Sequence, residues 1–153
     1  MMTSTIEKLL ADYPSLVERA VIWGDMDAAR HVNNTVYVKW SEVGRTEYLA
    51  AFEPGGLGGE GKRFGPILHT VSCKFIYPLT YPDTVYLGTR ISEMQEDRFV
   101  LETLMVSQKH ARVAALATGI IVWYDYQAWK KAPLPENFEE RIQSFEADAR
   151  RHR

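Results

Sequence analysis

Side chains able to do acid–base chemistry are concentrated in residues 23–34, which read WGDMDAARHVNN. Asp25 and Asp27 follow an apolar run, and a carboxylate in such a place can act as a nucleophile or as a base that activates water. Asn33 is a natural N-cap for a helix that begins directly after it. The first amides of a helix lack intrahelical acceptors and carry the positive end of its dipole, so they suit a developing oxyanion. A carboxylate beside a helix start can therefore support acyl transfer without serine, cysteine or a metal.

The segments around this stretch are recognised by the period of their apolar residues. Residues 17–23 alternate as a strand does, and residues 35–52 have the spacing of a long helix. The apolar face of that helix is expected to contain Val36, Trp40, Val43, Gly44 and Ala51, with Tyr37 and Tyr48 at its edges. Its opposite side carries further apolar residues, which predicts that the helix is buried on more than one side.

Four more strands follow the helix and are joined mostly by short turns. We expect them at 67–77, 84–91, 99–107 and 113–124. Consecutive strands joined by tight turns must be antiparallel, which predicts an α+β domain with one antiparallel sheet packed on the long helix. Residues 1–14 are expected to add an N-terminal helix capped by Ser4 or Thr5, and residues 135–153 a C-terminal helix and tail, within one domain that spans residues 1–153.

The composition is that of an ordinary globular protein, with 46% apolar residues, 25% charged residues and a formal net charge of −2. No basic excess is available to neutralise phosphates, which argues against nucleic acid as the main partner. The single cysteine, Cys73, allows no intrachain disulfide and is expected to be a buried, inert thiol. The N-terminus lacks the features of a secretory signal and the apolar runs are too short to span a bilayer, so we expect a cytoplasmic protein without a membrane partner.

The stretch 23–49 closely resembles the signature of the hotdog-fold acyl-CoA thioesterases of the 4-hydroxybenzoyl-CoA thioesterase family. The matching positions are Asp25, Asp27, His31, Val32, Asn33, Asn34, Tyr37, Glu42 and Arg45. Residues 75–91, FIYPLTYPDTVYLGTRI, are also similar to the family's third strand region. The resemblance implies a hotdog fold, in which an antiparallel sheet wraps around one long central helix. It also implies hydrolysis of an acyl thioester without a metal or redox cofactor, by a homodimer or homotetramer whose sites lie at the subunit interface.

Carried over position by position, the resemblance assigns the catalytic carboxylate to Asp27. The backbone N–H of Asn34 matches the group that polarises the thioester carbonyl. The expected substrate-binding residues are Asn34, His31, Asn33, Tyr37 and Glu42. One position departs from the family, because the residue before the histidine is usually glycine and is Arg30 here. Arg30 must adopt an ordinary backbone conformation or tolerate strain, and its charge also suits an anionic substrate.

Several of these residues have a structural interpretation as well. Asp25 is expected to shape the loop by accepting hydrogen bonds from nearby backbone. His31 is either a loop organiser or a general acid. Glu42 and Arg45 are most simply an i,i+3 pair on the helix. Alternatively, Glu42 supplies a carboxylate, as this helix does in some related hotdog thioesterases.

The phosphates of a CoA ligand need positive charge from the protein. Arg98 opens an expected strand at a place where family members often have a phosphate-facing residue. Lys74, Lys109 and Arg112 are further candidates at strand ends or on polar strand faces. For all four, a solvated side chain is the alternative explanation.

Other interpretations compete with a thioesterase. An aspartate pair after a strand is typical of haloacid-dehalogenase-type phosphatases, but those need alternating strands and helices. Asp25, Asp27 and His31 could hold a metal, although no third strong ligand is obvious. A hotdog hydratase or dehydratase, or a hotdog that binds an acyl thioester without cleaving it, shares the fold. The sequence favours hydrolysis of an acyl-CoA or acyl-carrier-protein thioester, because the histidine follows the aspartate within the same loop.

Overall fold

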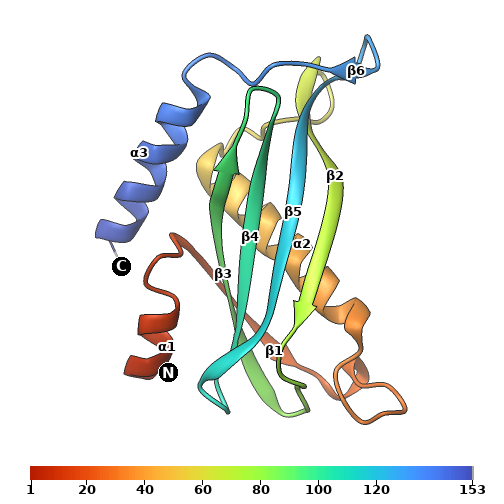
Figure 1. The fold of residues 1–153 in the computed structure, drawn as a ribbon, viewed down its shortest axis with the longest axis vertical. Helices are drawn as coiled ribbons and strands as arrows, with labels where there is room; N and C mark the ends of the chain where they lie inside the picture. The colour runs from red at the N-terminus through yellow and green to blue at the C-terminus, as the bar shows by residue number, and fades with distance from the viewer. Residues whose placement is uncertain (153) are drawn as a thin grey trace.

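A computed structural model of the chain describes residues 1–152. One long helix, α2 (Asn34–Phe52), lies against a curled antiparallel sheet (Figure 1). The strands are β1 (Ser15–Val21), β2 (Phe64–Phe75), β3 (Asp83–Met94), β4 (Arg98–Ser107) and β5 (Arg112–Asp125), and they are connected in the order β1-β3-β4-β5-β2. The predicted α+β architecture, a sheet around one long central helix, is confirmed.

The shorter elements depart from the prediction in detail. Helix α1 (Ser4–Leu9) is capped by Thr3, whose hydroxyl accepts the Ile6 amide, so the predicted caps are wrong. A two-residue strand, β6 (Lys130–Lys131), pairs with β5 and was not predicted. Helix α3 (Phe138–Arg151) begins after the expected 135, and the last residue of the predicted tail lies outside the described residues. No helix within residues 1–152 is long and apolar enough to cross a membrane.

The buried face of α2 is rotated from the predicted one. Its buried residues are Tyr37, Trp40, Ser41, Gly44, Arg45 and Tyr48. Ala51, predicted to be on this face, is exposed, and so is the outward-facing Val38. The spacing of apolar residues predicted the wrong face of α2, because two polar residues, Ser41 and Arg45, are buried on the true one. The Arg45 guanidinium donates to the Ser41 hydroxyl at 3.0 Å. The prediction that α2 is buried on more than one side is therefore wrong for a single chain.

Gly44 allows α2 to approach the sheet closely. A Cβ atom at this position would lie 2.6 Å from the Thr89 hydroxyl and 3.0 Å from a Thr103 methyl group, both on buried strand residues. Gly44→Ala is expected to lower the free energy of unfolding by about 1–3 kcal/mol, because the overpacking outweighs the gain in helix propensity. Urea unfolding would measure the change, and an alanine variant as stable as the wild type would contradict this account.

Strand β2 forms one edge of the sheet and contains a bulge. The pairing with β5 shifts between Leu68 and Thr70, which places Leu68 rather than Ile67 on the helix side, beside Gly119. The predicted unbroken alternation from Ile67 to Tyr77 is therefore wrong. The outer edge of this 12-residue strand has no neighbour within the described chain, and several of its apolar side chains are exposed: Phe64, Ile67, Leu68, Val71 and Phe75.

A short hairpin connects β5 to β6 and is held by the carboxylate of Asp125. Asp125 accepts hydrogen bonds from the Arg63 guanidinium at 2.7 and 3.1 Å and from the amides of Gln127 and Ala128 at 3.0 Å. Arg63 precedes β2, so the ion pair ties the hairpin to the start of the edge strand. Figure 1 shows this hairpin projecting beyond the β2 edge at the upper end of the sheet.

The hairpin contact has a pH dependence whose sign is determined by Asp125. The Arg63 guanidinium and the Ala128 and Gln127 amides lower the pKa of Asp125 to about 2. The ionised Asp125 carboxylate therefore contributes its full share to the free energy of unfolding above the ordinary carboxyl pKa. This contribution is lost as the pH falls from about 4 to about 2. We expect wild type to be more stable than Asp125→Asn at pH 6, with the difference shrinking toward pH 2. Urea unfolding at several pH values measures this, and a constant difference would contradict it.

Helix α3 is attached to the core by a buried carboxylate. Glu146 accepts the Tyr48 hydroxyl and the Ile91 amide, each at 2.8 Å, and pairs with Arg150. Burial, and then the neighbouring carboxylate, raise the pKa of Tyr48. Phe138 and Ile142 of the same helix pack in the cluster that contains Tyr48. Helix α3 therefore closes the sheet at the C-terminal end of α2, away from the polar loop that precedes α2 (Figure 1).

Candidate active site

The loop between β1 and α2 is ordered by its own backbone. The Asp27 amide donates to the His31 carbonyl at 3.1 Å, and the Arg30 amide donates to the Asp27 carbonyl at 2.9 Å. The Asp25 carbonyl accepts the Asn33 amide, and its carboxylate accepts the Ile22 amide, both at 2.9 Å. Asp25 thus makes the loop-shaping contacts expected of it. These bonds fix the position of Asp27 relative to the start of α2.

The Asp27 carboxylate is exposed and is oriented by two donors. One oxygen accepts the Ala29 amide at 2.8 Å, and the other accepts the Asn33 side-chain amide at 3.1 Å. The Asn33 side-chain oxygen in turn accepts the Thr35 amide at 2.9 Å, so Asn33 is the N-cap of α2, as predicted. One side chain therefore connects the carboxylate to the helix start.

A cavity of about 270 Å³ opens directly beside the start of α2. Its walls are formed by His31, Val32, Asn34, Tyr37, Phe75, Ile76, Tyr77 and Pro78. Asn34 is the first residue of the helix, and its amide has no acceptor within residues 1–152. Such an amide, at the positive end of the helix dipole, can stabilise an anionic oxygen. Asp27 is not part of the wall, and its carboxylate accepts the side-chain amide of Asn33, the residue that precedes Asn34.

Aromatic rings form much of the cavity wall. Tyr37 makes edge-to-face contacts with Phe75 and Trp40, at centroid distances of 5.3 and 5.5 Å. Its hydroxyl accepts the Leu79 amide at 3.2 Å, and burial raises its pKa. The hydroxyl thus holds the 77–79 segment in place, and the ring is the part of Tyr37 available to a ligand.

Segment 75–78 supplies half of the wall, although the sequence pattern predicted no role for it in the site. The Tyr77 ring lies under the Arg112 guanidinium at 4.2 Å and beside the His110 ring at 4.9 Å. The sequence signal was present in FIYP, where aromatic residues precede a proline that lies just beyond the end of a strand. Only the fold shows that this strand end lies against the start of α2.

Arg30 retains the left-handed backbone that the usual glycine would adopt, with φ of +63°. Of the two outcomes predicted for this position, strain is the one found, and Asp27 still accepts hydrogen bonds from Ala29 and Asn33. The Arg30 side chain is exposed and has no ion-pair partner within the described residues.

Replacing Arg30 by glycine tests this strain. An L-residue other than glycine costs roughly 1–2 kcal/mol in the left-handed region, and the flexibility of glycine in the unfolded chain offsets part of the gain. We expect Arg30→Gly to raise the free energy of unfolding by about 0.5–1 kcal/mol. Chemical denaturation measures it, with Arg30→Ala as the control that removes the side chain but keeps the strain. Equal stability of the two variants would refute the explanation.

The predicted pair between Glu42 and Arg45 does not form. Glu42 pairs instead with Lys39 at 3.1 Å on the exposed side of α2, and Arg45 is buried against Ser41. The difference arises because the sheet covers the Arg45 side of the helix and leaves Glu42 in solvent. Glu42 is not part of the cavity wall.

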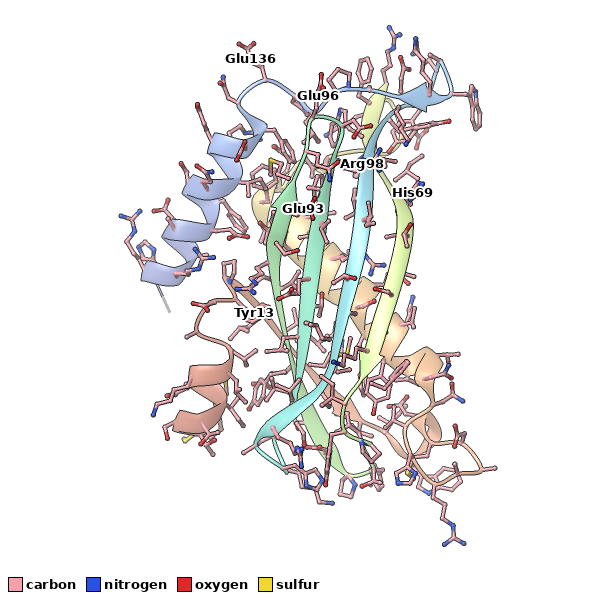
Figure 2. All side chains as sticks on the ribbon, in the orientation of Figure 1. Tyr13, His69, Glu93, Glu96, Arg98 and Glu136 are labelled. Atoms are coloured by element: carbon pink, nitrogen blue, oxygen red, sulfur yellow. The ribbon has the colours of Figure 1, made fainter. Side chains whose placement is uncertain are left out.

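The predicted phosphate-binding residues are dispersed. Arg98 pairs with Asp97 at 2.8 Å and lies at the upper end of the sheet, far from the start of α2 (Figure 2). Arg112 lies next to the cavity, because its guanidinium lies over the ring of the wall residue Tyr77. Lys74 precedes the wall residue Phe75 on β2, and Lys109 lies in the β4–β5 turn, where its amide donates to Asp83.

The remaining candidate groups take no part in the arrangement. Cys73 is half-buried against the core, less than predicted, and burial raises the pKa of its thiol. Within residues 1–152, no three or more histidine, cysteine, aspartate or glutamate side chains are grouped to hold a metal ion, and this includes Asp25, Asp27 and His31.

The sheet wrapped around one helix defines the class of the molecule, which is the hotdog fold. The chain belongs to the thioesterase-like superfamily, whose family model matches residues 21–142. No curated protein matches the sequence.

Solved structures agree with this membership. A thioesterase from Thermus thermophilus, solved with coenzyme A and Zn, is 28% identical and has a TM-score of 0.76 over 89% of this chain and 96% of its own. A gentisyl-coenzyme A thioesterase is also 28% identical, with a TM-score of 0.68 over 82% of this chain and 99% of its own. A 1,4-dihydroxy-2-naphthoyl-CoA thioesterase from Synechocystis, 22% identical, shares the fold with a TM-score of 0.71 over 84% and 94% of the two chains.

Proposed function

We propose that the chain hydrolyses an acyl-CoA thioester to a carboxylic acid and free CoA. The observation that carries the proposal is the link through Asn33, which holds the Asp27 carboxylate beside a helix start whose first residue, Asn34, lines a cavity. A base and an oxyanion donor then lie on either side of a carbonyl group placed at the cavity mouth. Membership in the thioesterase-like superfamily, and a coenzyme A complex of a related thioesterase, support the choice of substrate.

The Asn34 amide would stabilise the oxygen of the thioester carbonyl. As a base, Asp27 takes a proton from water while the water oxygen bonds to the carbonyl carbon. The tetrahedral intermediate then breaks its C–S bond, and the thiolate of CoA takes up the proton held by Asp27, which restores the carboxylate. As a nucleophile, Asp27 instead displaces the thiolate and forms an anhydride that water hydrolyses. Label found in the Asp27 side chain after a single turnover in ¹⁸O-labelled water would establish the nucleophilic route, because a general base never forms a bond to the water oxygen.

The cavity walls suit the acyl group, with aromatic rings on several sides and His31 near the opening. The Arg112 guanidinium, which lies over Tyr77, is placed to attract the phosphates of CoA at the same opening. Glu42 stays the alternative source of a carboxylate, from the exposed side of α2.

We further propose that two copies pair through β2. Its outer edge is long and unpaired within the described chain, and its neighbouring side chains are apolar and exposed. Such an edge is a template for a second strand, and antiparallel pairing with its own copy is a closed two-fold contact. Val38 of α2 is exposed as well, which leaves part of the helix open to a partner. Pairing would also bring Arg98 of the partner subunit toward the cavity, because antiparallel strands exchange ends.

The direct test is release of free thiol from a panel of acyl-CoA esters, with aromatic, short aliphatic and long aliphatic acyl groups, and from acyl-carrier-protein thioesters. We expect release from at least one acyl-CoA, with a rate that saturates in substrate. Binding of acyl-CoA without thiol release would instead identify a non-catalytic binding protein and overturn the proposal.

A further inference from the structure

We infer that the β5–β6 hairpin of one chain completes the thioester site of the partner chain, with Trp129 placed against the bound ligand. The inference rests on the proposed function and on pairing through β2. It assigns a role to residues 126–131, which lie far from the loop between β1 and α2 within one chain (Figure 1).

Trp129 is an unusual residue for the tip of a hairpin. Its side chain is 80% exposed, and its backbone is left-handed, with φ of +55°. Glycine or asparagine would relieve the strain, and exposure of an indole to water gains nothing for the fold. A strained, exposed tryptophan is therefore better explained by a contact outside its own chain.

The hairpin is held rigidly enough to serve as part of a site. The Asp125 carboxylate binds the Arg63 side chain and two hairpin amides, and Asp125 is the register partner of Phe64 at the start of β2. The hairpin thus moves with the N-terminal end of the edge strand. Lys130 follows Trp129, is exposed and has no ion-pair partner within residues 1–152, so the tip also carries positive charge.

The two-fold pairing places this tip at the second chain's site. The hairpin and the loop between β1 and α2 both extend past the β2 edge, at opposite ends of the sheet (Figure 1). Antiparallel pairing along all of β2 sets Phe64 of one chain opposite Phe75 of the other. Phe75 is part of the cavity wall, and Phe64 lies beside the hairpin. The hairpin of one chain then lies at the cavity mouth of the other, where a CoA ester needs a flat apolar surface and a cation.

Trp129→Gly tests the role of the side chain. We expect a fall of about tenfold in kcat/KM for the preferred acyl-CoA, as for the loss of an aromatic contact to a ligand. The melting temperature should stay equal or rise, because the change relieves the left-handed backbone and removes no buried side chain. Unchanged kcat/KM, or a fall in activity that merely follows a fall in stability, would overturn the inference.

A mixed dimer tests whether Trp129 acts on the partner. Chains carrying Asp27→Asn and chains carrying Trp129→Gly would be co-expressed with different tags, and the doubly tagged dimer purified. One of its two sites then combines an intact Asp27 with an intact Trp129 from the opposite chain, so we expect about half of the wild-type thiol release. If Trp129 served its own chain, neither site would be intact, and activity no higher than that of the Trp129→Gly homodimer would overturn the inference.

Crosslinking tests the geometry without catalysis. In a Cys73→Ser background, one chain would carry Trp129→Cys and the other Ala28→Cys, at the exposed tip of the Asp27 loop, and a short bismaleimide would be added. We expect a covalent dimer, whereas Lys8→Cys on α1 paired with Trp129→Cys should give none. A dimer that does not crosslink through the first pair would refute the placement of the hairpin. Absence of thiol release from wild type, with crosslinking intact, would refute the hydrolase proposal alone.

Discussion

Asp27→Asn is expected to lower kcat for the preferred acyl-CoA by about 10³-fold, within the range of about 10²–10⁴ for loss of a positioned base. Asparagine is almost the same size, and its side-chain oxygen can still accept the Ala29 amide. The loop should keep its shape, and KM should change by less than about threefold, because the Asn34 amide and the cavity remain. Thiol release under saturating substrate measures kcat, and circular dichroism checks the fold.

Asp25→Asn is the matched control for this prediction. It removes the same negative charge two residues away, from a carboxylate that accepts a hydrogen bond from the Ile22 amide. We expect kcat to stay within about threefold of the wild type. If Asp27→Asn were equally active, Asp27 would not be the catalytic group, and Glu42→Gln would become the decisive variant. If both variants failed alike, the carboxylates would act through loop structure and not through chemistry.

Two lysines on the helix side of β2 are expected to separate the proposed dimer into single chains. Leu68 and Val71 are 42% and 37% exposed, so Leu68→Lys with Val71→Lys should leave the single chain folded. In a paired edge the same lysines would be desolvated on both copies, which we expect to raise the dissociation constant by at least about 100-fold. Thiol release should fall as the dimer is lost, because each proposed site needs the partner's hairpin.

Sedimentation velocity over a range of protein concentrations measures this effect. The matched control places lysines at Thr70 and Ser72, which are exposed on the same strand. Backbone pairing tolerates charge at solvent-facing positions, so we expect this variant to remain dimeric and active. A stable dimer in the Leu68 and Val71 variant would show that the copies associate through another surface.

Local sequence determined much of the candidate site because its parts lie close together in the chain. Asp27, Asn33 and Asn34 fall within eight residues, and a cap followed by a helix determines how they are oriented. The Asn33 bonds to Asp27 and Thr35 follow from that local geometry. The sequence also identified Arg30 as unusual, because the family usually has glycine there. Two outcomes were predicted for it, an ordinary backbone or strain, and its φ of +63° shows strain.

Contacts between distant segments were not predictable in the same way. Arg45 and Ser41 are buried as a polar pair under the sheet, where apolar spacing pointed to Ala51 instead. The bulge at Leu68 and Thr70 inserts one residue into β2, and such an insertion leaves no signature in an alternating pattern. The buried polar pair and the bulge both depend on how closely the sheet approaches the helix. Gly44 permits a close approach, but a glycine in the sequence does not predict one.

The sequence by itself determined the strand and helix order and the loop that presents Asp27, because periodicity, capping and turn chemistry act over a few residues. The hotdog class followed from the resemblance of residues 23–49 to a family signature. Only the tertiary structure decided that the end of β2 forms half of the cavity wall, that Arg98 lies at the opposite end of the sheet, and that the β5–β6 hairpin projects beyond the open edge. These relations depend on strand order, which places β2 at the edge beside β5 although β3 and β4 come between them in the chain. Strand order is a property of the packed sheet, and no short stretch of residues contains it.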